Sequence, residues 1–215
     1  MNAIADRAGD VTPEWLTEVL QAGGAELVVA SAAAAPVGTG QMGFTHRVRL
    51  TYDGPAGPPT MIVKLAAEDE TARQAVAMGY RAEVGFYQHL AAQVDVRAPR
   101  CWHAAIVDDG RFTLLLDDVV GAVAGVQANG CSLEEAQAAL GNLVGLHAST
   151  WKDPSLRDRR FLMRADAVAA HMGQILAPAV ETFIEQYKGE LDGADQATLR
   201  SVGAAIGQWR RGEDE

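Results

Sequence analysis

Residues 44–52 alternate between large, mostly apolar side chains and polar ones without a break, and this alternation constrains the fold more than any other feature of the sequence. A period of two predicts a β-strand. Three glycines precede the strand, Gly38, Gly40 and Gly43, in the pattern G-x-G-x-x-G. Where this pattern binds a dinucleotide, the third glycine opens a helix. Here it opens a strand, so the glycines are predicted to close a β-hairpin, and an NAD-linked oxidoreductase is disfavoured.

A glycine-rich hairpin suits nucleotide phosphates, because the backbone can come close where no Cβ intrudes and its N–H groups can then meet the charged oxygens. The predicted phosphate-binding turn also includes Thr39 and Gln41, which lie between the glycines. The pattern alone leaves a second interpretation open, in which the glycines only make a tight hairpin.

A lysine, Lys64, interrupts the apolar run at residues 61–65, which is also predicted to be a strand. A lone ammonium among apolar side chains is costly unless it is paired. The predicted partner is Glu83, on a helix over about residues 70–92. Glu83 lies beside the apolar stripe of that helix, which consists of Val76, Tyr80, Val84 and Tyr87. In the alternative interpretation, Lys64 extends into solvent from an edge strand.

The glycine hairpin, strand lysine and helix glutamate follow one another in the order of the ATP-holding parts of the protein-kinase-like fold. The chain therefore resembles the small-molecule kinases of the aminoglycoside phosphotransferase group, and most of all their ecdysteroid-kinase-like and choline-kinase-like branch, also known as CHK kinase-like. The resemblance extends over residues 10–155. Beyond the glycines, it is carried by residues 62–65, 83–87, 114–118 and 146–148.

This resemblance implies an α+β fold in two parts. Residues 1–118 would form a protein-kinase-like N-lobe, with a five-stranded antiparallel sheet and one helix that packs on it. Residues 119–215 would form the hinge and the first helices of an incomplete, α-helical C-lobe. The strands other than residues 44–52 and 61–65 are predicted from residue 26 through the alanine-rich residues 31–35, at residues 100–107 and at residues 111–116.

The resemblance also implies a role for each candidate residue. The glycine turn would cover the phosphates of ATP, Lys64 would contact the α- and β-phosphates, and Glu83 would orient Lys64. Backbone groups at Asp117, Asp118 and Val119 would hold the edge of the adenine at the hinge. Asp118 has an alternative structural role, as the cap at the end of an element.

The catalytic loop of such kinases has no counterpart here. Phosphoryl transfer in this fold needs an Asp that receives the proton of the alcohol and an Asn a few residues later, written H-G-D-x-x-x-x-N in the family, and a later Asp for magnesium. The sequence past Trp151 contains no asparagine, and its only histidine, His171, precedes Met172. We therefore expect no catalytic residues and no metal ligands in this chain, with Mg²⁺ only in a complete family member.

The resulting expectation is the ATP-binding portion of a phosphotransferase for an unknown small-molecule alcohol, without turnover of its own. The chain would then be a shortened piece of a kinase. The alternative is a natural, non-catalytic nucleotide-binding or protein-interaction module of the pseudokinase type.

Local signals predict the other helices. Thr12 is predicted to cap a helix that starts at Pro13 and stops at residues 23–24. Ser132 and Glu135 form a capping box for a helix that runs to about Trp151. The helix places His147 on an apolar stripe, where a hydrogen-bonded core histidine is expected. Helices are also predicted near residues 165–175, 179–191 and 195–210, with Pro178 separating the first two.

Composition limits the partners and the location. The net charge of −10 argues against nucleic acids and anionic membranes, which require clustered Lys and Arg. Cys101 and Cys131 have no metal-ligand spacing and are expected to pack in the interior. No apolar run reaches the length of a membrane span and residues 1–6 lack the features of a signal peptide, so a cytoplasmic location is expected. The helices from Ser132 onward would expose apolar faces, which predicts a homodimer or a domain swap.

Overall fold

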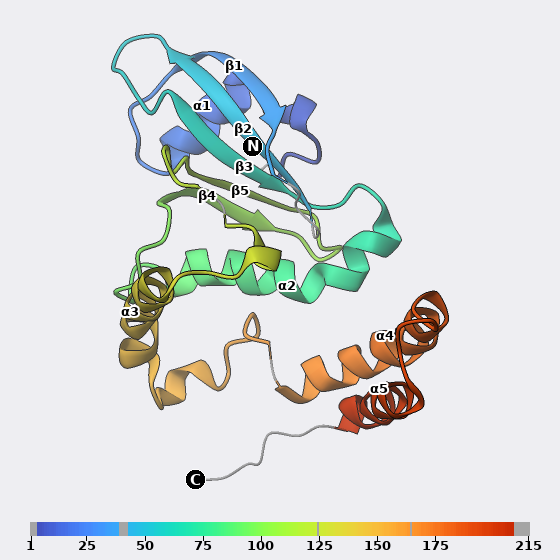
Figure 1. Ribbon diagram of the computed structural model, residues 1–215. Coiled ribbons are helices and arrows are strands. Elements are labelled where there is room, and N and C mark those ends of the chain that lie inside the picture. Colours follow the sequence, from blue (N-terminus) through green and yellow to red (C-terminus); the bar gives the residue numbers. More distant parts are fainter. Residues whose placement is uncertain (1–3, 39–42, 124, 164, 209–215) are drawn as a thin grey trace. The chain divides into compact units, whose positions relative to one another are not determined.

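The computed structural model describes residues 4–38, 43–123, 125–163 and 165–208 (Figure 1). Packing divides the chain into two compact units, Met1–Leu162 and Met163–Glu215, and each is described by itself. The lobe boundary predicted after residue 118 lies inside the first unit and stays a prediction.

The first unit is an α+β structure built on one five-stranded antiparallel sheet, as predicted. The strands in spatial order are β1 (Val29–Pro36), β2 (Phe44–Tyr52), β3 (Thr60–Leu65), β5 (Phe112–Asp117) and β4 (Cys101–Ile106). Each strand runs antiparallel to its neighbours. The alanine-rich stretch lies within β1, so its prediction as a strand is confirmed.

Helix α1 (Pro13–Ala22) covers one face of the sheet (Figure 1). Its start follows the predicted signals, because the Thr12 side chain accepts a hydrogen bond from the Trp15 N–H and Pro13 occupies the first turn. The strands turn every second residue toward this face, where they meet the apolar side of α1. The resulting core includes Leu16, Val19, Leu20, Val48, Leu50, Met61, Val63, Leu65 and Leu115.

Helix α2 (Glu70–His89) packs on the other face, mainly over β4 and β5 (Figure 1). Asp69 caps it by accepting a hydrogen bond from the Ala72 N–H. The apolar stripe of α2 meets the alternate residues of the strands in a second core, made of Ala66, Tyr80, Val84, Phe112, Leu114 and Leu116. Lys64 belongs to this face because it alternates with the α1-facing residues of β3.

Helix α3 (Leu133–Thr150) begins with the predicted capping box between Ser132 and Glu135. The predicted apolar stripe is present, but none of the residues of α3 is buried. The prediction of a core histidine is therefore wrong, because His147 is exposed. Together with Trp151, α3 lines a shallow cavity of about 370 Å³, formed by Leu140, Leu143, Val144, His147, Ala148 and Trp151.

The second unit pairs α4 (Ala165–Gln186) with α5 (Gly193–Ala205), which continues into a short 3-10 turn, Ile206–Gln208. The predicted break at Pro178 is wrong, because α4 runs through it. Proline removes the N–H that would bond to the carbonyl of Gln174. Both residues are exposed, so water can hydrate that carbonyl and the cost is small enough for packing to maintain the helix.

One helix segment, Ala167–Gln186, is long and apolar enough to cross a membrane by length and composition, contrary to the sequence-based expectation. Only 17% of the 18-residue apolar stretch within this segment is buried. The segment carries Glu181, whose carboxylate accepts two hydrogen bonds from Arg200 of α5 at 2.8 and 3.0 Å. One such helix is weak evidence for a membrane span.

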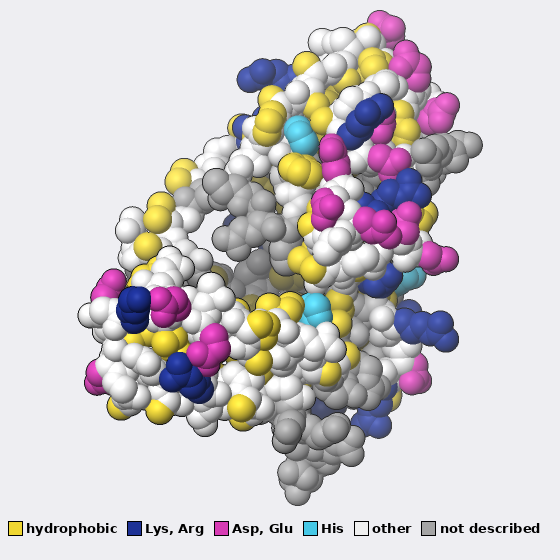
Figure 2. Space-filling view, turned by 90° about the vertical axis from the view of Figure 1, so that its right-hand side faces the viewer, with side chains coloured by type: hydrophobic (Ala, Val, Ile, Leu, Met, Phe, Trp, Pro, Cys, Tyr) yellow, Lys and Arg dark blue, Asp and Glu magenta, His cyan; other side chains and the backbone are white. Residues whose placement is uncertain are grey.

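Charged side chains of both signs are interspersed on the face of the molecule that Figure 2 shows. Acidic residues are in excess in the sequence, but on this face basic side chains lie among the acidic ones.

Candidate functional site

Lys64 and Glu83 form an ion pair between the sheet and α2. The Lys64 Nζ lies 2.5 Å from the Glu83 Oε1, and the side chains are 32% and 35% exposed. The predicted pairing is thus present. The alternative in which Lys64 reaches solvent from an edge strand is wrong, because β3 lies between β2 and β5 in the interior of the sheet.

Helical spacing explains how α2 places the Glu83 carboxylate near Lys64. Tyr80 and Val84 are buried against the sheet, and Glu83 lies between them in sequence at the margin of that buried face. The Tyr80 ring packs on Phe112 of β5 with 4.5 Å between ring centroids. This contact fixes α2 over β5, so Glu83 is held beside the strand that carries Lys64.

Two neighbours of the pair, Tyr87 and Cys101, are uncharged at neutral pH. Burial, with smaller electrostatic contributions from Glu83 and Cys101, raises the pKa of Tyr87 to about 12. Burial also raises the pKa of Cys101 to about 11, against the smaller lowering effect of a hydrogen bond with the His103 backbone. Neither an ionised phenol at Tyr87 nor a thiolate at Cys101 therefore competes with Glu83 for the Lys64 ammonium.

The two cysteines differ from what the sequence predicted. Cys101 packs against the core under α2, as expected for an interior thiol. Cys131 is exposed, so its predicted packing role is wrong. It precedes the cap of α3, a helix that no other part of the described first unit buries, and this explains its exposure.

Gly43, the last glycine of the predicted turn, lies against the end of β3. A Cβ on Gly43 would lie 2.7 Å from the Leu65 carbonyl oxygen, so only glycine permits this approach. Gly38 has φ of +74°, in the left-handed region that favours glycine. Both glycines thus serve the hairpin that the sequence predicted. Thr39, Gly40 and Gln41 lie outside the described residues.

Strand pairing places Gly43 near the ion pair. In register, Thr45 of β2 lies opposite Lys64 and Leu114 of β5 lies on its other side. Thr45 follows Gly43 by two residues, so Gly43 and Lys64 lie at the same end of the sheet. This end combines a part-exposed cation with backbone from which Cβ atoms are excluded.

The three predicted hinge residues lie at the end of β5. The Asp117 carboxylate accepts a hydrogen bond from Trp102 Nε1 at 2.7 Å. Val119 is exposed. The Asp118 carboxylate accepts hydrogen bonds from Arg47 Nε at 2.6 Å and Nη2 at 3.1 Å, and its side chain is 5% exposed. Asp118 therefore has a structural role, but as an ion-pair partner rather than as the predicted cap.

The Arg47–Asp118 pair was not predicted from the sequence. The hydrogen bonds from Arg47 are the main cause of the lowered pKa of Asp118, with a further contribution from Thr60. Arg47 faces the same side of the sheet as Lys64, because it lies two residues beyond Thr45. The alternation along β2 could have predicted which face Arg47 lies on. It could not predict a partner that is more than 70 residues away in the sequence.

Among the described residues, no group of three or more His, Cys, Asp and Glu side chains could hold a metal ion. The site thus consists of a part-exposed cation, its carboxylate partner and closely approaching backbone at Gly43. No known family model matches the chain, and no curated protein matches it.

Proposed function

We propose that this chain is the ATP-binding portion of a small-molecule kinase of the protein-kinase-like fold, related to the aminoglycoside phosphotransferases and their ecdysteroid-kinase-like branch. The observation that carries the proposal is the Lys64–Glu83 ion pair at the end of the sheet where Gly43 approaches β3. The antiparallel order β1-β2-β3-β5-β4, with the turn between β1 and β2, supports it.

The residues present fit the phosphates of a nucleotide. An ammonium carries three N–H donors, and the Glu83 carboxylate accepts from Lys64, which leaves donors for phosphate oxygens. One third of the Lys64 side chain is exposed, so a ligand can reach it. Glu83 fixes the direction of the ammonium, and the backbone near Gly43 can come close to the phosphates because it has no Cβ.

The other end of the ligand would lie at the end of β5. Backbone groups of residues 117–119 are proposed to hold the adenine edge, while the Asp117 and Asp118 carboxylates keep their partners Trp102 and Arg47. The acceptor is proposed to be a small-molecule alcohol. The sequence lacks the H-G-D-x-x-x-x-N loop, so we propose binding without turnover for this polypeptide, and Mg²⁺ is assigned no protein ligand here.

Thermal unfolding with added ATP tests the proposal. A ligand that binds only the folded state stabilises it by about 2.7 kcal/mol at a hundredfold excess over Kd, so the melting temperature should rise. Lys64→Ala should abolish the rise. Lys188→Ala is the matched control, because Lys188 also pairs with a glutamate, at 2.7 Å, but in the second unit. A wild-type melting temperature that millimolar ATP leaves unchanged would contradict the proposal.

A non-catalytic interaction module is the second candidate, and the exposed apolar face of α3 favours it. Leu140, Val144 and Trp151 are 63%, 61% and 74% exposed. Exposed patches of this kind mark interaction surfaces, so we propose that a second copy or a domain swap covers it. Leu140→Asp should then reduce a concentration-dependent rise in mass in sedimentation. Kinase turnover by the chain would contradict the module.

A further inference from the structure

The first described residues of the chain, residues 4–10, are anchored to the sheet. The Ala5 N–H donates to Thr113 Oγ1 at 2.9 Å, and the Thr113 hydroxyl donates to the Ala5 carbonyl at 3.0 Å. Ala5 and Thr113 are both fully buried. The segment therefore has a fixed position on β5, from which its charged residues can act on neighbouring elements.

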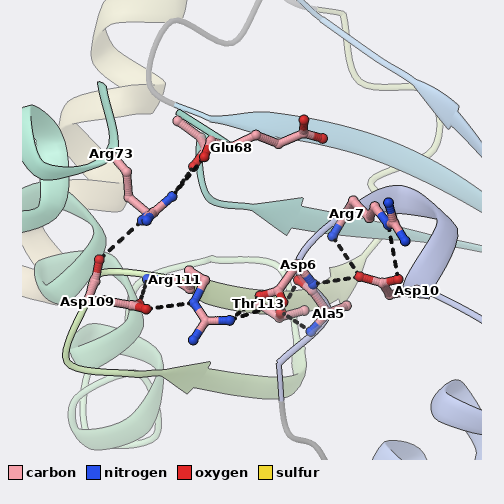
Figure 3. Close-up of polar contacts among 10 residues, drawn as sticks. Ala5, Asp6, Arg7, Asp10, Glu68, Arg73, Asp109, Arg111 and Thr113 are labelled. Carbon is pink, nitrogen blue, oxygen red and sulfur yellow. Dashed lines mark hydrogen bonds and ion pairs between the residues drawn. The ribbon is translucent and has the colours of Figure 1, made fainter. Parts of the chain in front are cut away.

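A continuous series of polar contacts runs from this segment to α2 (Figure 3). Arg111 Nη1 donates to both carboxylate oxygens of Asp6 at 3.1 Å, and Arg111 Nε donates to the Asp109 carboxylate at 2.8 Å. The backbone carbonyl of Asp109 then accepts hydrogen bonds from Arg73 Nε at 3.2 Å and Gln74 Nε2 at 2.9 Å. Asp109 thus contacts Arg111 with its side chain and α2 with its backbone carbonyl.

Arg73 extends the series to the loop that follows β3. Its side chain is nine-tenths buried, and Nη1 donates to the carbonyls of Ala67 and Glu68 at 3.0 Å each. Three carbonyls from two segments therefore surround one guanidinium. A buried charge satisfied in this way is displaced only at high cost, so Arg73 fixes the start of α2 relative to both the loop after Lys64 and the β4–β5 turn.

The β4–β5 turn contacts α2 again further along the helix. Arg81 Nη2 donates to the Asp108 carbonyl at 3.1 Å. Gly110, with φ of +82°, lies where an added Cβ would touch Ala77 at 3.4 Å. Arg81 is only two residues before Glu83, so the turn contacts the part of α2 that carries the carboxylate.

We propose that residues 4–10 position α2 through Asp6, Arg111, Asp109 and Arg73, and thereby set the geometry of the Lys64–Glu83 pair. Arg111 is a positioning residue, since it touches neither member of that pair. The effect on α2 follows from the contacts alone, and its consequence for nucleotide affinity rests on the proposed function. Displacement of the segment would release the β4–β5 turn, then α2, and then Glu83.

Hydrogen exchange of the full chain, followed by mass spectrometry, tests the proposal in Arg111→Ala. Local opening of an element raises the exchange of its own amides, so exchange in residues 70–89 should rise about fivefold, while exchange in residues 44–52 changes less than twofold. Arg111→Lys should restore part of the protection because it keeps the charge beside Asp6. Arg7→Ala is the matched control, since it breaks an exposed ion pair to Asp10 within the same segment.

Unchanged exchange of α2 in Arg111→Ala would overturn the proposal, and so would an equal rise in every element, which indicates global destabilisation alone. ATP affinity is measured separately. If α2 loses protection in Arg111→Ala but wild type does not bind ATP, the positioning role stands and the proposed function fails. If wild type binds ATP and Arg111→Ala leaves α2 unchanged, the proposed function stands and the positioning role fails.

Discussion

Replacing Thr113 with valine removes a hydroxyl that is both donor and acceptor for one backbone residue, Ala5. Valine has nearly the same shape, so the change creates no cavity. Each lost hydrogen bond costs about 1 kcal/mol net when the freed groups can regain water, as they can if the segment detaches. We therefore expect a loss of about 2 kcal/mol. In a chain of this length that corresponds to a fall of about 4–8 °C in melting temperature.

Thr113→Ser provides the control, because serine keeps the hydroxyl and loses one methyl group. Removal of a buried methyl group costs about 1 kcal/mol. The serine variant should therefore be more stable than the valine variant, although it buries less apolar surface. Urea unfolding, followed by circular dichroism, measures both. A valine variant as stable as the serine variant would refute the reasoning, since packing rather than the hydroxyl would then anchor the segment.

Three further outcomes are expected. Iodoacetamide at pH 8 should modify exposed Cys131 quickly and leave Cys101 intact, because a pKa of about 11 leaves roughly one Cys101 thiol in a thousand ionised. Equal labelling of the two cysteines in peptide mass spectrometry would contradict this. The pKa of Asp118 is lowered below 3.8 in the folded state, so its contribution to stability is present above that value and is lost as pH falls through the folded pKa. Asp118→Asn should therefore flatten the acid limb of urea unfolding below about pH 4, and an unchanged limb would contradict the ion pair with Arg47. Gly43→Ala should lower the melting temperature because its Cβ would meet the Leu65 carbonyl at the end of β3. Gly9→Ala should be better tolerated, because the space around Gly9 is open. A larger fall in melting temperature for Gly9→Ala than for Gly43→Ala would contradict the close approach.

Local periodicity was sufficient to predict most of the first unit. Alternation in residues 44–52 depends only on neighbours in sequence, and so do the caps of α1 and α3. The Lys64–Glu83 pair is a long-range contact, yet it could be predicted because a cation in an apolar strand requires a partner. The energetic cost of an unpaired buried charge was therefore enough to predict a contact between residues that are distant in sequence.

Features that depend on the surroundings of an element could not be predicted in this way. The apolar stripe of α3 suggested burial of His147, but burial requires a second surface, which the described first unit does not supply. Pro178 suggested a break, but exposure lets water satisfy the carbonyl it leaves free. The contact between Asp6 and Arg111 joins residues 105 positions apart, both exposed enough to need no partner, so nothing in the sequence required it.

A turn between two strands is usually where a protein gains or loses residues without harm. The turn from Val107 to Arg111 is different, because Asp109 uses its side chain in one direction and its carbonyl in another. One added residue would rotate these two groups apart, and the N-terminal segment and α2 would no longer share an attachment point. Its length should therefore resist change during evolution, and a tag or linker inserted there should disturb the ion pair of Lys64 more than one inserted in the exposed loop after β2.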